Sequence, residues 1–398
     1  MSHTTAPAAP TLLFGAFDRH NFGDLLFPHV AAALLPGREL RFVGLAARDL
    51  RGWGGHRVEP LATVAAQLGA TPANLLHVGG ELLACDAWEA AVMLLPAQQV
   101  PAILARLDQL PAERLAWARQ ALGIAGRAPY VVGTELLPQA RRLFAAVGGM
   151  DLDARAPELR AEVREKLRTA DFLAVRDART LAWLRQSGIA AALLPDPAVL
   201  VAELFAARIA RHAGRGEIAR LRRDLARGYL AVQFSTEFAD DASLAAIAAG
   251  LQHAAHAHGL GVALFRAGAA PWHDELDGYR RCAARLAVPV RIVESLDIWD
   301  ICALLAHSRG YLGSSLHGRI VAGAFARPRL NLHATAPGKP AAYAATWEAD
   351  LPLSVAPADI ATGLDAAQAA DPASLRRLAR ELAARYREGF AALHARLL

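Results

Sequence analysis

The chain has 398 residues, 54% hydrophobic and 20% charged, which predicts a soluble globular protein long enough for two domains of ordinary size. The formal charge of +5, from 43 basic and 38 acidic residues, is small for this length, and the arginines are interpreted as dispersed, so we expect no nucleic acid partner. No apolar run approaches the ~20 residues that span a bilayer, so we expect no transmembrane segment.

At the start of the chain, residues 1–10 have neither the basic start nor the long apolar run of a secretory signal. We expect a disordered tail there. The three cysteines lie far apart and include no CxxC pair, which is typical of a reducing compartment. The predicted location is the cytoplasm.

The first domain, expected over residues 11–205, opens with a buried strand at 11–17, a polar loop, and an apolar helix from 25 to 35. This order is typical of the first unit of a doubly wound sheet. The loop lacks GxGxxG spacing, so dinucleotide binding is disfavoured. Asn21 and Asp24 lie in the loop, where they either face a ligand or form only an Asx turn and an N-cap.

Strands and helices then alternate, which favours a mostly parallel sheet with helices on both faces. Strands are expected at 39–45, 74–78, 130–132, 172–175 and 191–194, and helices at 101–122, 158–169 and 179–186. Because ligands gather outside the carboxyl ends of such strands, the polar residues there are candidates for a cleft. They include Gly80, Glu81, Glu135 and Arg176. Arg176 either clamps an anion or forms an ion pair with neighbouring Asp177.

A charged, glycine-dotted stretch at residues 206–227 is interpreted as the linker, after which the alternation restarts in a second domain at 228–356. Its strands are expected at 229–234, 262–265, 290–293, 310–312 and 329–332, with helices at 242–258, 275–286, 297–306 and 316–326. Residues 357–398 predict two amphipathic helices that pack back across the domain boundary. The predicted fold class is α/β, with two Rossmann-like domains and mostly parallel sheets.

The junction between the strand at 310–312 and the next helix is the strongest candidate for chemistry. The strand breaks at Gly313, and Ser314 and Ser315 offer N-caps. Such a helix start points free backbone N–H groups and the positive end of the helix dipole outward. We therefore expect an anion pocket built from the main chain.

His317 and Arg319 lie in the first turn of that helix. The dipole disfavours the charged form of a histidine at this position, so His317 is expected to be neutral and able to accept a proton. An anion bound beside it would favour the charged form and make it an acid. The alternative is that Ser315 only caps a core helix and His317 packs beneath it.

Three further features are weaker. Among the basic residues, lysine occurs only at Lys166 and Lys339, and Lys339 is the better placed to bind a ligand. For each lysine taken singly, the alternative is that it was retained by chance. The residues from Trp272 to Glu275 follow a predicted strand and form either part of the cleft or an exposed loop and cap. His253 and His256 share a helix face without an acidic or cysteine partner at ligand spacing, so no metal is expected.

Taken together, several segments resemble the polysaccharide pyruvyl transferase family. Each is short, so the specificity lies in their order across residues 11–345. They are Asn21-Phe22-Gly23-Asp24, Gly79-Gly80-Glu81, Val175-Arg176-Asp177 with Leu194-Pro195-Asp196-Pro197, and Ser314-Ser315-Leu316-His317-Gly318 with Lys339 downstream. Where many members have arginine before Leu-His-Gly, this chain has Ser315, and Arg319 on the next turn is expected to supply the charge.

The resemblance implies a fold like that of the two-Rossmann (GT-B) glycosyltransferases and a role in polysaccharide or exopolysaccharide biosynthesis. The implied reaction transfers a pyruvyl group from phosphoenolpyruvate onto two hydroxyls of a sugar or glycan, free or lipid-linked, to give a cyclic ketal and phosphate. Phosphoenolpyruvate is a co-substrate, and no cofactor is implied. On this interpretation His317 is the general acid and base. The donor would be bound in the second domain and at Arg176, by Gly313, Ser314, Ser315, Arg319 and Lys339, and the acceptor side would hold Asn21, Asp24, Gly80, Glu81 and Glu135.

Two other functions stay open. A glycosyltransferase of the same architecture would use a nucleotide sugar, and UDP or GDP rather than phosphoenolpyruvate would protect it from unfolding. A non-catalytic sugar- or anion-binding protein would bind ligand without releasing phosphate. Its binding would not change in the His317→Ala variant.

Overall fold

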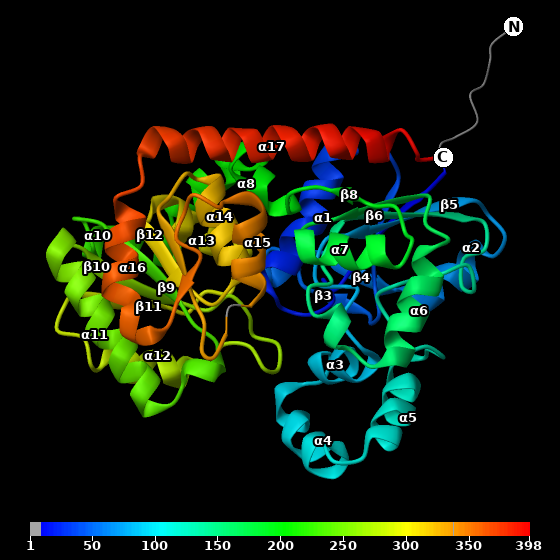
Figure 1. The fold of residues 1–398 in the computed structure, drawn as a ribbon, viewed down its shortest axis with the longest axis horizontal. Coiled ribbons are helices and arrows are strands. Elements are labelled where there is room, and N and C mark those ends of the chain that lie inside the picture. Colours follow the sequence, from blue (N-terminus) through cyan, green and yellow to red (C-terminus); the bar gives the residue numbers. More distant parts are fainter. Residues whose placement is uncertain (1–8, 337) are drawn as a thin grey trace, which may run out of the picture.

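Two α/β units, each built on a mainly parallel sheet, make up the fold of this chain (Figure 1). The computed structural model describes residues 9–336 and 338–398. The disordered tail expected at residues 1–10 lies outside this range for its first eight residues. Within the described residues, no helix has both the length and the apolar content needed to cross a bilayer.

The central strands of the first sheet are short, buried apolar runs, as expected for a parallel sheet covered on both faces. The strands are β1 (Thr11–Phe14), β2 (Leu40–Gly44), β3 (Arg48–Asp49), β4 (Arg57–Pro60), β5 (Ala73–Val78), β6 (Ala140–Val147), β7 (Phe172–Val175) and β8 (Ala192–Leu193). Their order in space is β3-β4-β2-β1-β5-β6-β7-β8. The described pairings are parallel except that of β3 with β4.

The prediction of a strand at residues 130–132 is wrong. Those residues are buried between Pro129 and Gly133 but form a turn, and the amide of Val132 donates to the His77 ring 3.3 Å away. The strand that the prediction missed is β6, which pairs with β5 and β7. Its two arginines, near the start of the run, obscured the apolar pattern of the residues that follow.

The helices of the first unit include all those predicted, one of them broken in two, and also α2 and α3, which were not predicted. They are α1 (Phe22–Leu34), α2 (Leu61–Leu68), α3 (Ala87–Met93), α4 (Val100–Leu107), α5 (Pro111–Leu122), α6 (Pro157–Leu167) and α7 (Ala178–Gln186). The helix expected at 101–122 is two helices, because Pro111 cannot continue α4 and instead begins α5. The pair α4 and α5 extends away from the sheet (Figure 1).

The second unit has a six-stranded sheet in which the described pairings are parallel. Its strands are β9 (Tyr229–Gln233), β10 (Gly261–Phe265), β11 (Val290–Val293), β12 (Gly310–Gly313), β13 (Arg329–Leu332) and β14 (Ser354–Val355). Their order is β11-β10-β9-β12-β13-β14. The helices between them are α11 (Asp241–His258), α12 (Leu276–Ala283), α13 (Ile298–His307), α14 (Leu316–Ala324) and α15 (Lys339–Trp347).

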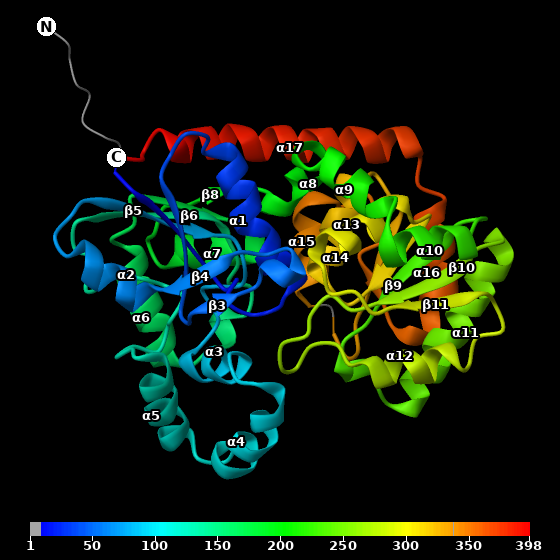
Figure 2. The same cartoon turned by 180° about the vertical axis from the view of Figure 1, so that it is seen from behind.

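Residues 206–227, which we expected to be a linker, are folded. After the short α8 (Val201–Leu204), they form α9 (Ala206–Ala213) and α10 (Gly216–Asp224). Both contact α13, so they belong with the second unit (Figure 2). Buried residues at helical spacing, among them Ile209, Ile218 and Leu221, explain why this charged stretch folds.

The C-terminal helices are α16 (Ile360–Gln368) and α17 (Pro372–His394), and α17 runs past both units (Figure 1). Tyr386 and Phe390 of α17 are buried in an apolar cluster that also contains residues of α1 and α13. The end of the chain is tied to the first unit, where the Leu398 amide donates to Asn74 over 2.8 Å. The expectation that these helices pack back across the boundary is confirmed.

Candidate functional site

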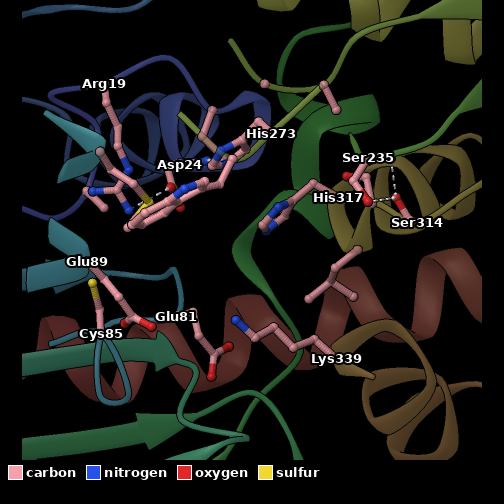
Figure 3. Close-up of a pocket in the computed structure, with 18 of the residues that line it drawn as sticks. Arg19, Asp24, Glu81, Cys85, Glu89, Ser235, His273, Ser314, His317 and Lys339 are labelled. Carbon is pink, nitrogen blue, oxygen red and sulfur yellow. Dashed lines mark hydrogen bonds and ion pairs between the residues drawn. The ribbon is translucent and has the colours of Figure 1, made fainter. Parts of the chain in front are cut away.

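A cavity of about 410 Å³ opens between the two units. The loops that follow β1, β5 and β7 of the first sheet line it from one side, and those that follow β9, β10 and β12 of the second sheet line it from the other. Both sheets therefore present the carboxyl ends of their strands to the same space, which is where open α/β sheets bind ligands. Figure 3 shows side chains from both units pointing into it.

Most of the residues expected at the site do lie around this cavity. They are Asn21, Asp24, Glu81, Arg176, Ser314, Ser315, His317 and Lys339. Gly80 has φ +84 and lies against Asp24, so it shapes the loop that carries Glu81. Gly313 ends β12 just before the lining residues.

His317 points into the cavity from the first turn of α14 (Figure 3). Ser315 is the N-cap of this helix, and its Oγ accepts the Gly318 amide over 3.2 Å. The Nε2 atom of His317 lies 3.5 Å from Asp196 Oδ2 and 3.4 Å from Arg176 Nη1. His317 is 8% exposed, so its ring is mostly buried but still borders the cavity.

Gly23 explains how the His317 ring reaches this position. A Cβ atom at residue 23 would lie 2.0 Å from both Cγ and Nδ1 of His317. The ring therefore rests against the bare backbone of α1, which is possible only because residue 23 has no side chain. The Asn-Phe-Gly-Asp motif of the first unit and the Leu-His-Gly motif of the second are thus in direct contact.

Three charged groups, two of them buried, connect His317 to the first unit. Arg176 is 3% exposed and bridges two carboxylates, with Nη1 2.8 Å from Asp196 and Nη2 2.8 Å from Glu81. Burial alone would raise the pKa of Asp196, but the hydrogen bond from His317 and the charges of His317 and Arg176 leave it below its ordinary value. Asp196 is therefore an anion beside the imidazole. Asp177, the partner we considered for Arg176, instead caps α7 through the Thr180 amide.

The main-chain anion pocket is smaller than expected. The amides of Ser314 and Ser315 donate to the Gln233 carbonyl and side chain, at 3.3 and 2.8 Å. The next two amides along, those of Leu316 and His317, have no acceptor within the described residues. The positive end of α14 therefore keeps two free N–H groups beside the cavity.

Two expected site residues lie elsewhere. Arg319 is fully buried, and its Nε donates to Glu348 over 2.8 Å while its other nitrogens bond Asn331 and the backbone of residues 352 and 353. It therefore anchors α14 from behind. Glu135 is exposed, and its carboxylate lies 3.6 Å from Lys166 in a different hollow of the first unit.

Lys339, at the start of α15, is the more accessible cation of the cavity. Its side chain is 41% exposed and lies 3.9 Å from Asp151. It extends toward Glu81 (Figure 3). Burial would raise the pKa of Glu81, but Lys339 and Arg176 together hold it below its ordinary value.

Several lining residues were missed. Gln233 is the last residue of β9, Ser235 follows that strand, and Arg19 follows β1. The signal was available, because they are polar residues at or after strand ends, but the prediction included only other strand ends. Asp196 was seen as part of a motif but was given no role.

The loop after β10 also lines the cavity. Trp272, His273 and Asp274 all border it, as one of the two interpretations of that segment predicted. Asp274 accepts hydrogen bonds from Gln233 and from the Ala267 amide, and burial raises its pKa to about 6. His273 Nε2 lies 3.0 Å from Asn21 Nδ2, so this loop touches the first unit.

Among the residues that the structure describes, no group of three or more His, Cys, Asp or Glu side chains is arranged to hold a metal ion. The groups that border the cavity are an ionisable ring, carboxylates, cations and the end of a helix.

One family model matches part of the chain. Residues 155–332 match the family model described as polysaccharide pyruvyl transferase. This confirms, over that range, the resemblance drawn from the motifs, and the range includes Arg176, Asp196 and His317. A comparison with curated proteins gives no match.

Solved structures of similar fold include UDP-GlcNAc 2-epimerases. That from Methanocaldococcus jannaschii, in complex with UDP-GlcNAc and UDP, has a TM-score of 0.52 at 9% identity and covers 94% of this chain and 99% of its own. The epimerase from Rickettsia bellii has a TM-score of 0.53 at 12% identity, and the match covers 98% of this chain and 97% of the epimerase. At such identities the likeness concerns the fold alone, and it confirms the predicted class of two Rossmann-like units.

Proposed function

We propose that this chain, whose residues 155–332 match the polysaccharide pyruvyl transferase family, transfers the pyruvyl group of phosphoenolpyruvate to a sugar. Two hydroxyls of the sugar would become bonded to C2 of the pyruvyl group as a cyclic ketal. The C2–O bond to phosphate breaks, and inorganic phosphate leaves. One hydroxyl proton ends on C3, which becomes a methyl group, and the other leaves with phosphate.

The observation that carries this proposal is the position of His317. Its ring borders the cavity between the two sheets, next to the helix end and to the Asp196 carboxylate. An acid and base for both halves of the reaction must face donor and acceptor at once, and a cavity lined by both units provides that position.

The donor is expected to lie on the second unit. Phosphoenolpyruvate carries a phosphate and a carboxylate, so it needs several donors and cations. The free amides of Leu316 and His317 and the ammonium of Lys339 border the same side of the cavity. Arg176 would contribute its field rather than direct contacts, because its terminal nitrogens already bond Asp196 and Glu81.

His317 would then change charge during the reaction. As an imidazolium it gives a proton to C3, which makes C2 electrophilic. As a neutral ring it takes the proton of the attacking hydroxyl. The nearby Asp196 anion would stabilise the imidazolium and orient the ring, in the way that a buried carboxylate orients a catalytic histidine.

The test is release of phosphate from phosphoenolpyruvate in the presence of a panel of sugars and glycans. The wild type is expected to release phosphate with at least one acceptor. His317→Ala should be slower by about 10² to 10⁴, the usual contribution of a general acid or base. The control is His253→Ala, which removes an exposed histidine of α11 and should leave the rate unchanged.

Equal rates for wild type and His317→Ala across a productive panel would refute the assignment of His317. Thermal protection by UDP or GDP without protection by phosphoenolpyruvate would favour a glycosyltransferase instead. Protection by phosphoenolpyruvate with no phosphate released from any acceptor would favour a binding protein.

A further inference from the structure

A second cavity lies at the opposite edge of the second sheet, where the strands begin. It has a volume of about 310 Å³ and is lined by residues at or before the starts of β9, β12 and β13. Four cationic or protonatable side chains border it: Arg222, His307, Arg309 and Arg327. They come from α10, from the end of α13, and from the turns before β12 and β13, so the fold gathers them from distant parts of the sequence.

No acidic residue borders this cavity, and within the described part of the chain no ion pair joins its three arginines to a carboxylate. The nearest acid on the same helix, Asp224, pairs instead with Arg291 at 2.9 Å. Two other arginine pairs of the second unit, Arg281 with Arg285 and Arg319 with Arg329, each share a carboxylate. The absence of an anionic partner distinguishes the arginines of this cavity from those two pairs.

Two of the three arginines also bond carbonyl groups at helix ends, but this uses only some of their donors. Nη1 of Arg222 donates to the Ala213 carbonyl at the end of α9 over 2.9 Å, and Arg327 donates through Nε and Nη2 to the Ala306 carbonyl near the end of α13. Each guanidinium has five N–H groups, so both keep unused donors. Arg309 is exposed and its side chain has no hydrogen-bond acceptor in residues 9–336 or 338–398, so all its donors are open to a ligand.

The positive groups also act on one another. Burial, together with the charge of Arg309, lowers the pKa of Arg327. Burial, together with the charges of Arg222 and Arg327, lowers the pKa of His307. Like charges held together in this way destabilise the free protein, and an anion placed among them would relieve the repulsion.

The surrounding surface has the same sign. Residues 206–227, which form α9 and α10, contain seven arginines and only two acidic residues. Their formal charge equals the +5 of the whole chain, so the arginines are less evenly dispersed than the sequence analysis assumed. This concentration of charge would raise the local concentration of anions beside the cavity.

We propose that this cavity binds a phosphoryl group, either of a free phosphate or diphosphate or of a phospholipid headgroup. Guanidinium groups match the geometry of phosphate oxygens and bind them in pairs. At ~30 Å³ per water, the cavity holds about ten waters, which is room for a diphosphate or a substituted phosphate. The site is separate from the cleft that contains His317, and it does not depend on the reaction proposed there.

The first test is calorimetric titration of the full chain with pyrophosphate at low ionic strength, where screening is weak. The variants are Arg309→Gln and Arg222→Gln, and the control is Arg223→Gln, which removes the same charge from an exposed residue of α10 that does not border the cavity. Each test variant is expected to lose at least about tenfold in affinity at one site, since it loses charge-assisted hydrogen bonds. The control should lose less than about threefold.

Arg309→Gln should fold, because the Arg309 side chain has no partner to lose, and its unliganded melting temperature should equal or exceed that of the wild type. Binding to the catalytic cleft is unaffected by these variants, so the difference between variant and control isolates the proposed site. A second titration uses vesicles of neutral phospholipid with and without an anionic phospholipid.

Arg309-dependent binding of pyrophosphate supports the proposal and identifies a soluble ligand. Arg309-dependent binding of the anionic vesicles alone also supports it and identifies a headgroup. If both test variants bind pyrophosphate and anionic vesicles as tightly as Arg223→Gln does, the proposal is wrong.

Discussion

At the scale of single residues, the position of the His317 ring depends on Gly23 of the first unit, which has no Cβ atom. The ring lies against the backbone of Gly23 so closely that a methyl group there would overlap Cγ and Nδ1, at 2.0 Å. Gly23 lies in the first turn of α1, and the N-cap of this helix, Asn21, accepts the amides of Gly23 and Asp24. The helix end therefore cannot shift easily to make room.

We expect Gly23→Ala to reduce activity by displacing His317 while the fold survives. A misplacement of about 1 Å in a reacting group can cost about 10² in rate. The rate of phosphate release should fall by that order, with the Michaelis constant for phosphoenolpyruvate changed much less. Gly52→Ala is the matched control, because a Cβ atom at residue 52 meets nothing within 4 Å. An unchanged rate in Gly23→Ala would show that the ring position is not critical.

The residue types of the site could be predicted from the sequence, but their hydrogen-bond partners could not. The motifs identified His317, Arg176 and Lys339 because an anionic donor requires such groups near a helix start. Arg319 is in the same turn as His317, yet its side chain points into the protein, where Glu348 holds it. Two residues of separation, at about 100° each, rotate a helix position by about 200°, and which face is inside depends on packing that a local motif does not specify.

At the scale of elements, the loop after β10 joins the cavity to the first unit. The backbones of Gly268 and Asn21 form an antiparallel bridge, and the Ala269 amide donates to the His20 ring over 3.2 Å. At the outer end of this loop, Trp272 has φ +65, an uncommon value for a large side chain, and is 46% exposed. An exposed aromatic ring in a strained position at the cavity edge is a candidate platform for a sugar ring.

We expect Trp272→Ala to weaken acceptor binding without affecting the donor. A loss of about 0.5 to 1.4 kcal/mol in stacking corresponds to a rise of about two- to tenfold in the Michaelis constant for the acceptor. The constant for phosphoenolpyruvate should not change. Trp53→Ala is the control, because Trp53 is similarly exposed, at 41%, but does not line the cavity. If both variants raise the constant for the acceptor equally, Trp272 has no specific role in acceptor binding.

The sequence predicted elements best where one pattern was uninterrupted. The strands of the second sheet were placed within a residue or so of β9 to β13, because each is an apolar run bounded by polar or glycine residues. The prediction missed β3, β4 and β14, which lie at or next to the sheet edges and have few buried residues, so they lack an apolar run. The helices α9 and α10 were mistaken for a linker because arginine dominates their composition, although their buried positions recur at helical spacing.

At the scale of the whole molecule, the two units share a core rather than meeting through solvent. A single apolar cluster contains residues of α1, α13, α14 and α17. Hydrogen bonds between the units reinforce it: Trp299 Nε1 donates to the Gly54 carbonyl over 3.2 Å, and Trp347 Nε1 donates to the Arg176 carbonyl over 2.7 Å. His317 and Asp196 come from different units, so the proposed activity requires this interface to stay closed.

A pair of neutral histidines makes the interface sensitive to acid. The Nε2 atom of His29 lies 2.7 Å from the Gly54 carbonyl, which accepts its hydrogen bond. The Nδ1 atom of His29 lies 3.1 Å from Nε2 of His56. A proton added to Nδ1 of His29 would place two N–H groups against each other. Burial lowers the pKa of His29 to about 4, and burial together with His29 lowers that of His56 to about 3.

Because both histidines have an ordinary value near ~6.5, the unfolded chain binds more protons than the folded protein between about pH 6.5 and pH 4. The free energy of unfolding should therefore fall as the pH falls through this range, by about 2 kcal/mol for each histidine at pH 5. His56→Phe keeps the ring that stacks on Phe42 but removes one titrating group. It should cost about 1 kcal/mol at pH 7, for the lost hydrogen bond, and that deficit should vanish or reverse at pH 5.

The measurement is denaturant unfolding of wild type, His56→Phe and the exposed-site control His253→Ala at pH 7 and pH 5. The control should lose as much stability as the wild type on acidification, since its deleted side chain is exposed on α11. If His56→Phe loses as much stability on acidification as the other two proteins, protonation of His29 and His56 does not cause the acid sensitivity. A smaller loss in His56→Phe would show that protonation of this pair destabilises the folded protein in acid.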